Sequence, residues 1–296
     1  MGKFPRTVPG RLLSEVGVWQ NRRIQVVTYN IQYSKGKDGV HDPERIAAEV
    51  AGADIIALQE VVRNVPGVPD DDQPEKLAEL LDGYIWVYGP ALDLGTGFDR
   101  CVQFGIMLLS LYPILSGRIL LLPRVGTIDR TSIERRALEG VIDAPGGPLR
   151  VYSVHLDHLN SCHRLEQIRW LRHVVLLAAS TGTTLTGPPW DLFGVPIMAV
   201  PTTDDCLLMG DFNMLPGSPA YDEMVGEPDY YQGRTLITGR LADAWTSAGR
   251  GLDDGATWSD GDVFVNGALA HRVRSSHVGD EAGGSDHDPL WAELDL

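Results

Sequence analysis

The sequence predicts an α/β domain in which mixed sheets pack into a sandwich. Of its 296 residues, 43% are hydrophobic and 22% are charged, which is enough apolar material for a full core. The expected order is strand, helix, strand, helix, and then mainly strands with one long helix, without the steady alternation of a doubly wound parallel fold. There is no internal repeat and no low-complexity tract. We therefore expect a basic lead-in over 1–22 and a single domain over 23–296.

The first half of the chain contains buried strands followed by short helices. β-Branched and apolar runs predict strands, and capping residues predict helix starts. Asp42 is suited to cap a helix whose first residue is Pro43. The first strand ends in Asn30 and the second ends in Glu60. We expect strands at 24–31, 54–61, 84–88 and 104–109, and helices at 42–50 and 74–81.

The second half contains a hairpin, the long helix and the central strand. Pro145, Gly146, Gly147 and Pro148 predict the turn between the hairpin strands. Residues 180–205 are rich in Thr, Gly and Pro, which indicates a long loop or insertion. The segment after Asn213 is expected to be irregular as far as Leu241. We expect strands at 137–142, 149–156, 207–211 and 263–265, a helix at 163–179, and a last strand after Asp286 and His287.

The end of the central strand carries the most informative side chains. Three apolar residues lead into Gly210, Asp211, Phe212 and Asn213. On an extended chain, Asp211 and Asn213 point to the same side because they are two residues apart. A carboxylate beside a carboxamide suits a hard metal ion, or a water and a phosphate held by hydrogen bonds. The alternative is a simple Asx-rich turn, which these residue types also favour.

Several strands end in polar groups, and this repetition predicts a shared site. Strand ends that converge on one rim are a common way to build a catalytic centre. Carboxylates and amides without cysteine favour Mg²⁺ or Mn²⁺ over structural zinc. The polar groups at or beside strand ends are Asn30, Glu60, His155, Asp211 with Asn213, and Asp286 with His287.

Five short motifs resemble those of the endonuclease/exonuclease/phosphatase superfamily, and they occur in the same order. The resemblance extends from residue 24 to the C-terminus. It implies a four-layer α/β sandwich with two packed mixed, mainly antiparallel sheets flanked by helices. It also implies metal-dependent hydrolysis of a phosphate ester by in-line attack of water. The motifs are Thr28–Ile31, Leu58–Val61, Val154–Leu156, Gly210–Asn213 and Ser285–His287.

The resemblance assigns a role to each matching residue. It implies that Glu60, Asn30 and Asp286 form the metal site, with Mg²⁺ or Mn²⁺ as cofactor. Asp211 matches the carboxylate that positions or deprotonates the attacking water, or assists the leaving group. Asn213 matches an amide that holds the phosphate or the water.

The resemblance also places two histidines and an arginine beside the substrate. It implies that His155 lies beside the scissile phosphate and that His287 is an acid–base group or a hydrogen-bond donor in the transition state. Arg136 resembles an arginine that contacts the substrate phosphate. A metal, two imidazoles and an amide would stabilise the charge that develops during attack on phosphorus.

The sequence departs from the family pattern at the carboxylate that orients the last histidine. Family members usually have an Arg-Ile-Asp-Tyr strand start here, and this chain has a shortened stretch. Asp262 is the better match for the orienting carboxylate, and Asp260 is the alternative. Gln32 stands where nuclease-like members often have a second metal-site residue, and its neutral amide would bind a metal less strongly.

A zinc site is the alternative use of the histidines after the second hairpin strand. It would involve His155, His158, Cys162 and His163, but their spacing matches no standard zinc motif. Asp157 and His158 resemble a Leu-Asp-His extension of bacterial members, which implies support of the site rather than catalysis.

The charge of the chain bears on the choice of substrate. The formal net charge is -15 and the pI is about 4.8. An acidic surface repels nucleic-acid backbones, so nucleic acid is a disfavoured partner. The first hypothesis is therefore a phosphoesterase acting on a small or lipid-like phosphodiester or phosphomonoester. A nuclease of the same fold is the alternative, and a non-catalytic binding module is the third hypothesis.

Cysteine usage and hydropathy indicate a cytoplasmic protein. The three cysteines Cys101, Cys162 and Cys206 are too few and too unevenly placed for a disulfide framework. The N-terminal residues contain no signal-like apolar segment, and the apolar runs are too short to span a membrane. The sequence makes no prediction of oligomeric state.

Overall fold

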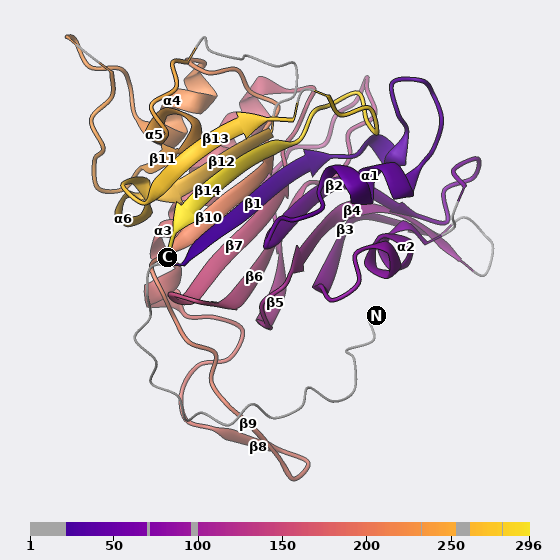
Figure 1. Ribbon diagram of the computed structural model, residues 1–296, viewed down its shortest axis with the longest axis horizontal. Coiled ribbons are helices and arrows are strands. Elements are labelled where there is room, and N and C mark those ends of the chain that lie inside the picture. Colours follow the sequence, from indigo (N-terminus) through magenta and orange to yellow (C-terminus); the bar gives the residue numbers. More distant parts are fainter. Residues whose placement is uncertain (1–21, 70–71, 96–99, 232, 253–260, 280) are drawn as a thin grey trace.

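The computed structural model contains two six-stranded sheets packed face to face, with helices on both outer faces (Figure 1). It describes residues 22–69, 72–95, 100–231, 233–252, 261–279 and 281–296. Each sheet contains one parallel pair of strands among antiparallel pairs. The predicted fold class, a four-layer sandwich of mixed and mainly antiparallel sheets, is therefore confirmed. The predicted lead-in 1–22 lies outside the described residues except for its last residue.

The first sheet has the strand order β13-β14-β1-β2-β4-β3. Its central pair, β1 and β2, runs parallel, so the carboxyl ends of these two strands lie at the same edge. Its strands are β1 (Arg23–Asn30), β2 (Ile55–Arg63), β3 (Ile85–Gly95), β4 (Cys101–Ser110), β13 (Val273–Val278) and β14 (Leu290–Asp295).

The second sheet has the strand order β11-β12-β10-β7-β6-β5. Its parallel pair, β7 and β10, also brings two carboxyl ends together. Its strands are β5 (Ile114–Leu121), β6 (Arg136–Ala144), β7 (Gly147–His155), β10 (Cys206–Asp211), β11 (Leu241–Asp243) and β12 (Gly261–Asn266).

Helices cover the outer face of each sheet. On the first sheet α1 and α2 pack over Val27, Ile56 and their neighbours. On the second sheet α3 and α4 pack over Tyr152, Leu208 and their neighbours. The α-helices are α1 (Pro43–Glu49), α2 (Gln73–Leu80), α3 (Ser161–Thr181), α4 (Pro219–Val225), α5 (Ala244–Ser247) and α6 (Gly267–Ala270), and a 3₁₀ turn, η1, covers Gln32–Ser34. Among the described residues no helix is long and apolar enough to cross a membrane.

The core between the sheets sets which side chains reach the site. Val26 on β1, Val151 on β7 and Leu207 on β10 all belong to this central core. Side chains two residues apart share a face of a strand. Asn30, His155 and Asp211 are separated from these core residues by even numbers, so they continue the inner faces to the edge of the sandwich.

The structure has elements that the sequence did not indicate. The segment after Asn213, expected to be irregular, contains α4, which Ser218 caps by accepting a hydrogen bond from the Tyr221 amide. β5 and β13 were also missed, since β5 alternates between partly buried and exposed residues and only two of the six residues of β13 are buried. The expected loop 180–205 contains the short hairpin β8 (Trp190–Leu192) and β9 (Val195–Ile197), which projects from the body of the molecule (Figure 1).

Candidate active site

Polar side chains from β1, β2, β7 and the loop before β14 gather around Asp211, the last residue of β10. The amide nitrogen of Asn30 donates to Asp211 Oδ2 at 2.8 Å, and His155 Nε2 lies 3.4 Å from the same oxygen. His287 Nε2 lies 3.7 Å from it. Glu60 Oε1 lies 3.4 Å from the amide nitrogen of Asn30 and 4.0 Å from His155 Nε2. These residues come from both sheets and from the loop before β14.

Glu60 reaches this cluster because β2 contains a β-bulge. Gln59 pairs with Ile106 and Val61 pairs with Gly105, so Glu60 is the extra residue of the bulge. Its φ is 60°, a left-handed conformation that non-glycine residues rarely adopt. The bulge also shifts the alternation of the strand, since Val61 packs on the outer face with Leu58. Glu60 is thereby turned toward the site rather than toward the helices.

A buried polar layer lies directly beneath the site. The Gln59 amide nitrogen donates to Thr28 Oγ1 at 3.2 Å and to Ser153 Oγ at 3.4 Å, and all three residues are fully buried. Gln59 and Thr28 belong to the first sheet and Ser153 to the second. A satisfied polar network of this kind holds neighbouring groups in one arrangement. The network joins the two sheets. Thr28 precedes Asn30 on one face of β1, and Ser153 precedes His155 on one face of β7, so the network lies directly beneath these two site residues.

The central strand ends at Asp211, and the chain then turns sharply. Asn213 has a φ of 50°, and its backbone amide donates a hydrogen bond to Asp211 Oδ1 at 2.9 Å. This arrangement is an Asx turn. The expectation that Asp211 and Asn213 share one side of an extended chain is therefore wrong, because β10 has ended. The side-chain nitrogen of Asn213 donates a hydrogen bond to the carbonyl oxygen of Leu156 at 3.2 Å. Leu156 follows His155 directly, so this bond ties Asn213 to the loop next to His155.

The closing pair, Asp286 and His287, is held by the loop after β1. Asp286 Oδ1 lies 2.7 Å from His287 Nδ1, and the Gln32 amide nitrogen donates to Asp286 Oδ2 at 2.7 Å. A carboxylate on Nδ1 leaves Nε2 of the imidazole facing Asp211. Asp286 therefore occupies the orienting position that the sequence assigned to another aspartate.

Burial determines the charge state of the central groups. Burial raises the pKa of Glu60 and of Asp211, while the hydrogen bond from Asn30 opposes the shift in both. Burial, followed by the nearby Arg135 charge, lowers the pKa of His155 well below its usual range. His155 is thus neutral at neutral pH and acts as a hydrogen-bonding imidazole rather than as a cation. Its Nδ1 is buried and has no hydrogen-bond partner within the described part of the chain.

Arg135 is the residue at the site that the sequence missed. It is 3% exposed, and its charge opposes part of the rise that burial causes in the pKa of Glu60 and of Asp211. One guanidinium nitrogen, Nη2, lies 2.8 Å from His158 Nδ1, whereas Nη1 is buried and has no partner among the described residues. The predicted substrate contact, Arg136, instead donates twice to Glu134, at 2.8 and 3.0 Å. No feature of the sequence separates these two adjacent arginines.

Asp262 lies opposite Gly210 of β10 in the second sheet. It shares a face of β12 with Phe264, which packs in the core under α3 and α4. Its charge acts on Tyr221 of α4, whose pKa is raised by burial, then by Asp243, and further by Asp262. The prediction that Asp262 orients His287 therefore disagrees with the structure, because the strand presents it to the outer face. The alternative, Asp260, lies outside the described residues.

The histidines after β7 do not converge on a zinc ion. Asp157 accepts from His163 Nδ1 at 3.2 Å, His158 contacts Arg135, and Cys162 is exposed. Asp157 also accepts the amides of Leu159 and Asn160, which fixes the loop next to His155. Within the described residues, no group of three or more His, Cys, Asp or Glu side chains is arranged to hold a metal by itself.

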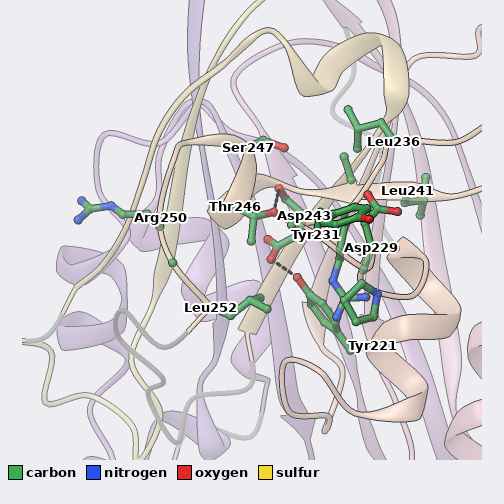
Figure 2. A pocket seen from close by; sticks show the side chains of 16 residues that line it. Tyr221, Asp229, Tyr231, Leu236, Leu241, Asp243, Thr246, Ser247, Arg250 and Leu252 are labelled. Carbon is green, nitrogen blue, oxygen red and sulfur yellow. Dashed lines mark hydrogen bonds between the residues drawn. The ribbon is translucent and has the colours of Figure 1, made fainter.

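A separate cavity of about 660 Å³ lies on the outer face of the second sheet, between α4, the loop that follows it and α5 (Figure 2). The hydroxyl of Tyr221 points to Asp243 and donates to its Oδ2 at 2.7 Å. Asp243 is buried and caps α5 through the Trp245 amide. These groups satisfy one another, and none of the predicted catalytic residues lines the cavity. We therefore assign the site to the strand ends rather than to this cavity.

The fold and the rim of carboxylate, amide and imidazole groups define the class of protein: a four-layer α/β sandwich with groups suited to hydrolysis. The model of the endonuclease/exonuclease/phosphatase family matches residues 27–287, and the chain belongs to this family. Members of the family are usually hydrolases. A search of curated proteins found no match.

Solved structures with the same fold include proteins of several activities. An endonuclease/exonuclease/phosphatase from Beutenbergia cavernae DSM 12333 is 25% identical, with a TM-score of 0.63, over 93% of this chain and 72% of that chain. The mannosyl-6-phosphatase Bt3783 of Bacteroides thetaiotaomicron VPI-5482 is 18% identical, with a TM-score of 0.59, over 92% and 99%. D. rerio TDP2, complexed with a single-strand DNA product, is 14% identical, with a TM-score of 0.60, over 93% and 99%. The last two similarities are evidence of the shared fold alone.

Proposed function

We propose that this protein is a phosphoesterase that depends on Mg²⁺ or Mn²⁺ and hydrolyses a small or lipid-like phosphodiester or phosphomonoester. The observation that carries the proposal is the convergence on Asp211 Oδ2 of Asn30, His155 and His287, within 2.8 to 3.7 Å. Arg135 adds a buried guanidinium whose Nη1 has no hydrogen-bond partner among the described residues. Such a set can bind a phosphoryl group and move a proton beside it.

The side chains divide the reaction between them. A water attacks phosphorus in line with the ester oxygen, and Asp211 accepts a proton from it, for which a buried carboxylate with a raised pKa is suited. Neutral His155 and Arg135 each donate a hydrogen bond to a non-bridging phosphoryl oxygen, His155 from Nε2 and Arg135 from Nη1. As the ester bond breaks, His287 in its imidazolium form, with Nδ1–H held by Asp286, gives its Nε2 proton to the leaving oxygen. The proton taken up by Asp211 then returns to Nε2 of His287, which lies 3.7 Å from Asp211 Oδ2.

The residues present fit a divalent metal ion in their donor chemistry. Glu60 and Asp286 would hold the ion, since Mg²⁺ is commonly bound by one or two carboxylates and several waters. Burial is the main cause of the raised pKa of Glu60, so its ionised form would gain from a cation held beside it. The side-chain nitrogen of Asn30 donates a hydrogen bond to Asp211, and its side-chain oxygen accepts one from the backbone amide of Gln32. Asn30 therefore holds the carboxylate of Asp211 in place. When bound, the ion supplies charge neutralisation at the phosphoryl oxygens.

The net charge is the reason for preferring a small ester over a nucleic acid. A molecule with a net charge of -15 repels each of the many phosphates of a polyanion that lies along its surface. A small ester carries only one or two charges and is therefore repelled less. Mannosyl-6-phosphatase Bt3783 and TDP2 with its DNA product share the fold, so fold alone does not select the substrate. A nuclease remains the alternative outcome of the test below.

The first experiment measures hydrolysis of p-nitrophenyl phosphate and bis(p-nitrophenyl) phosphate with Mg²⁺, Mn²⁺ or EDTA. We expect metal-dependent turnover that is lost in Glu60→Ala and in His287→Ala. The preferred ester distinguishes a monoesterase from a diesterase, and turnover of DNA or RNA alone would indicate the nuclease. A folded protein that turns over none of these and binds no metal would favour the non-catalytic binding module.

Two adjacent arginines provide a matched test of the site. Arg135→Gln removes the guanidinium beside Asp211, and we expect kcat/KM to fall by about 10²-fold or more, as for the loss of one oxyanion donor. Arg136→Gln breaks a partly exposed pair with Glu134 and should change kcat/KM by less than about threefold. Equal effects of the two substitutions would contradict the assignment of Arg135.

A further inference from the structure

We propose that Glu49, at the end of α1, is a positioning residue that holds the segment carrying His287. This inference rests on the proposed function, because it concerns the acid–base group of that reaction. Glu49 belongs to neither sheet and does not touch Asp211. Its role follows from three hydrogen bonds that converge on one carboxylate.

The Glu49 carboxylate accepts hydrogen bonds from two consecutive backbone amides of the His287 segment. Glu49 Oε1 accepts from the amide of Gly283 at 2.7 Å and from the amide of Gly284 at 2.9 Å. Its second oxygen, Oε2, accepts from the Tyr29 hydroxyl at 2.9 Å. Hydrogen bonds to an ionised acceptor are short and stronger than neutral ones. The helix is thereby tied to the segment at one point and to β1 at another.

The packing at this point is too close for a side chain on Gly284. A Cβ there would lie 2.5 Å from Glu49 Oε2 and 2.7 Å from Ile46 Cδ1. Arg45, on the same helix, donates to the Gly283 carbonyl at 3.1 Å, so both sides of that residue are bound by α1. The Lys37 amide donates to the same carbonyl at 3.2 Å.

The held segment leads directly to the catalytic rim. Ser285 follows Gly284, and its hydroxyl donates to the carbonyl oxygen of Asn30 at 2.8 Å. The His287 amide donates to the same hydroxyl at 3.3 Å. Two residues therefore separate the Glu49 contact from His287, and each has a hydrogen bond toward β1 or within the rim. Loss of the Glu49 contact should let Nε2 of His287 move away from Asp211.

The same helix offers a matched control. Glu44 lies on α1 and forms an exposed ion pair with Lys76 at 2.8 Å. Among the described residues it makes no hydrogen bond or ion pair with the His287 segment. Glu44→Ala therefore removes the same kind of charge from the same helix. Glu49→Gln keeps one oxygen that can accept both glycine amides, so it tests whether the hydrogen bonds or the charge matter.

The test compares Glu49→Ala, Glu49→Gln and Glu44→Ala in the full chain, by steady-state kinetics and by hydrogen exchange of the peptide covering 281–288. We expect Glu49→Ala to lower kcat about tenfold or more, with KM within about threefold, since an interaction with the reacting group acts mainly on the chemical step. We expect faster exchange of this peptide in that variant alone. Glu49→Gln should recover kcat to within about threefold of wild type, and Glu44→Ala should match wild type.

Two outcomes overturn the inference. One is unchanged exchange of 281–288 in Glu49→Ala; the other is faster exchange with an unchanged kcat. If Glu49→Ala does not fold, Tyr29→Phe removes one of the three hydrogen bonds, and the same two readouts decide. If the wild type has no activity on any ester, the proposed function fails, whereas the exchange experiment still shows whether Glu49 holds the segment.

Discussion

Glu60 combines two unfavourable features at one position, a left-handed backbone and a buried carboxylate. Its φ is 60°, and burial raises its pKa above the ordinary value of 4.5. Strained backbone and destabilised charge both persist when the surrounding structure imposes them, and both are concentrated at functional sites. In the metal-free protein, the ionised Glu60 side chain should therefore cost stability.

This cost predicts that Glu60→Gln stabilises the metal-free protein at neutral pH. The folded state binds the Glu60 proton more tightly than the unfolded state, so ionisation of Glu60 lowers the free energy of unfolding as pH rises above about 4.5. A neutral amide avoids that loss. We expect a gain of about 0.5–2 kcal/mol at pH 7, the range typical of relieved active-site strain.

Denaturant unfolding in EDTA at several pH values measures this gain. The difference between Glu60→Gln and wild type should shrink as pH falls and disappear below about 4.5, where the wild-type carboxyl becomes protonated in both states. Glu44→Gln is the control, since the pKa of that exposed carboxylate is lowered by Lys76 and its loss relieves nothing. A gain that grows toward acid pH would contradict the reasoning.

The sequence identified site residues where a strand delivers them and failed where their position depends on loops. Asn30, His155 and Asp211 follow from strand alternation and lie together in the structure. Arg135 precedes β6, so no alternation separates it from Arg136. Asp262 was assigned by motif position, but the register of β12 places it on the outer face. The partner of His287 Nδ1 is its own neighbour, Asp286, a contact that no motif indicated.

At the scale of elements, strands buried on both faces were the most predictable. β2 and β10 are almost completely buried and appear in the sequence as continuous apolar runs. Edge strands were more difficult to predict from the sequence. β13 and β5 each lie at an edge of their sheet, and β13 contains several polar residues that hide its strand pattern. The short helix α4 depends on tertiary packing of Tyr221 and Met224, which local periodicity over seven residues does not reveal.

The close approach of β10 to β7 is the element-scale requirement for the site. A Cβ on Gly210 would lie 2.1 Å from the carbonyl oxygen of Val154. Gly210→Ala therefore forces the two parallel strands apart at the residues just before Asp211 and His155. We expect a loss of about 1–3 kcal/mol in the free energy of unfolding, typical of overpacking, together with a large fall in kcat.

Thermal unfolding and steady-state kinetics on the same preparation check this prediction. Gly267→Ala is the matched control, since a Cβ there meets no atom within 4 Å and the residue opens α6. It should leave both stability and activity near wild type. Wild-type values for Gly210→Ala would show that the strands can separate without disturbing the site.

At the scale of the whole molecule, the charge of -15 acts on every substrate before it reaches the rim. Like charge lowers the local concentration of an anionic ester, and dissolved salt screens that repulsion over distances of about 10 Å at 0.1 M. A polyanion gripped by a local basic groove behaves in the opposite way, because salt weakens its binding. Salt dependence therefore separates the two leading functions without knowledge of the natural substrate.

We predict that kcat/KM for p-nitrophenyl phosphate rises about two- to fivefold as NaCl increases from ~20 to ~200 mM at saturating metal, because screening removes repulsion between the acidic surface and the dianion. The singly charged bis(p-nitrophenyl) phosphate should respond more weakly, which controls for effects of salt on the protein itself. Steady-state assays of both esters over a series of NaCl concentrations give the dependence of kcat/KM on salt for each ester. A fall in kcat/KM with salt for DNA or RNA, steeper than any change for the small esters, would instead establish local attraction of a polyanion and favour the nuclease.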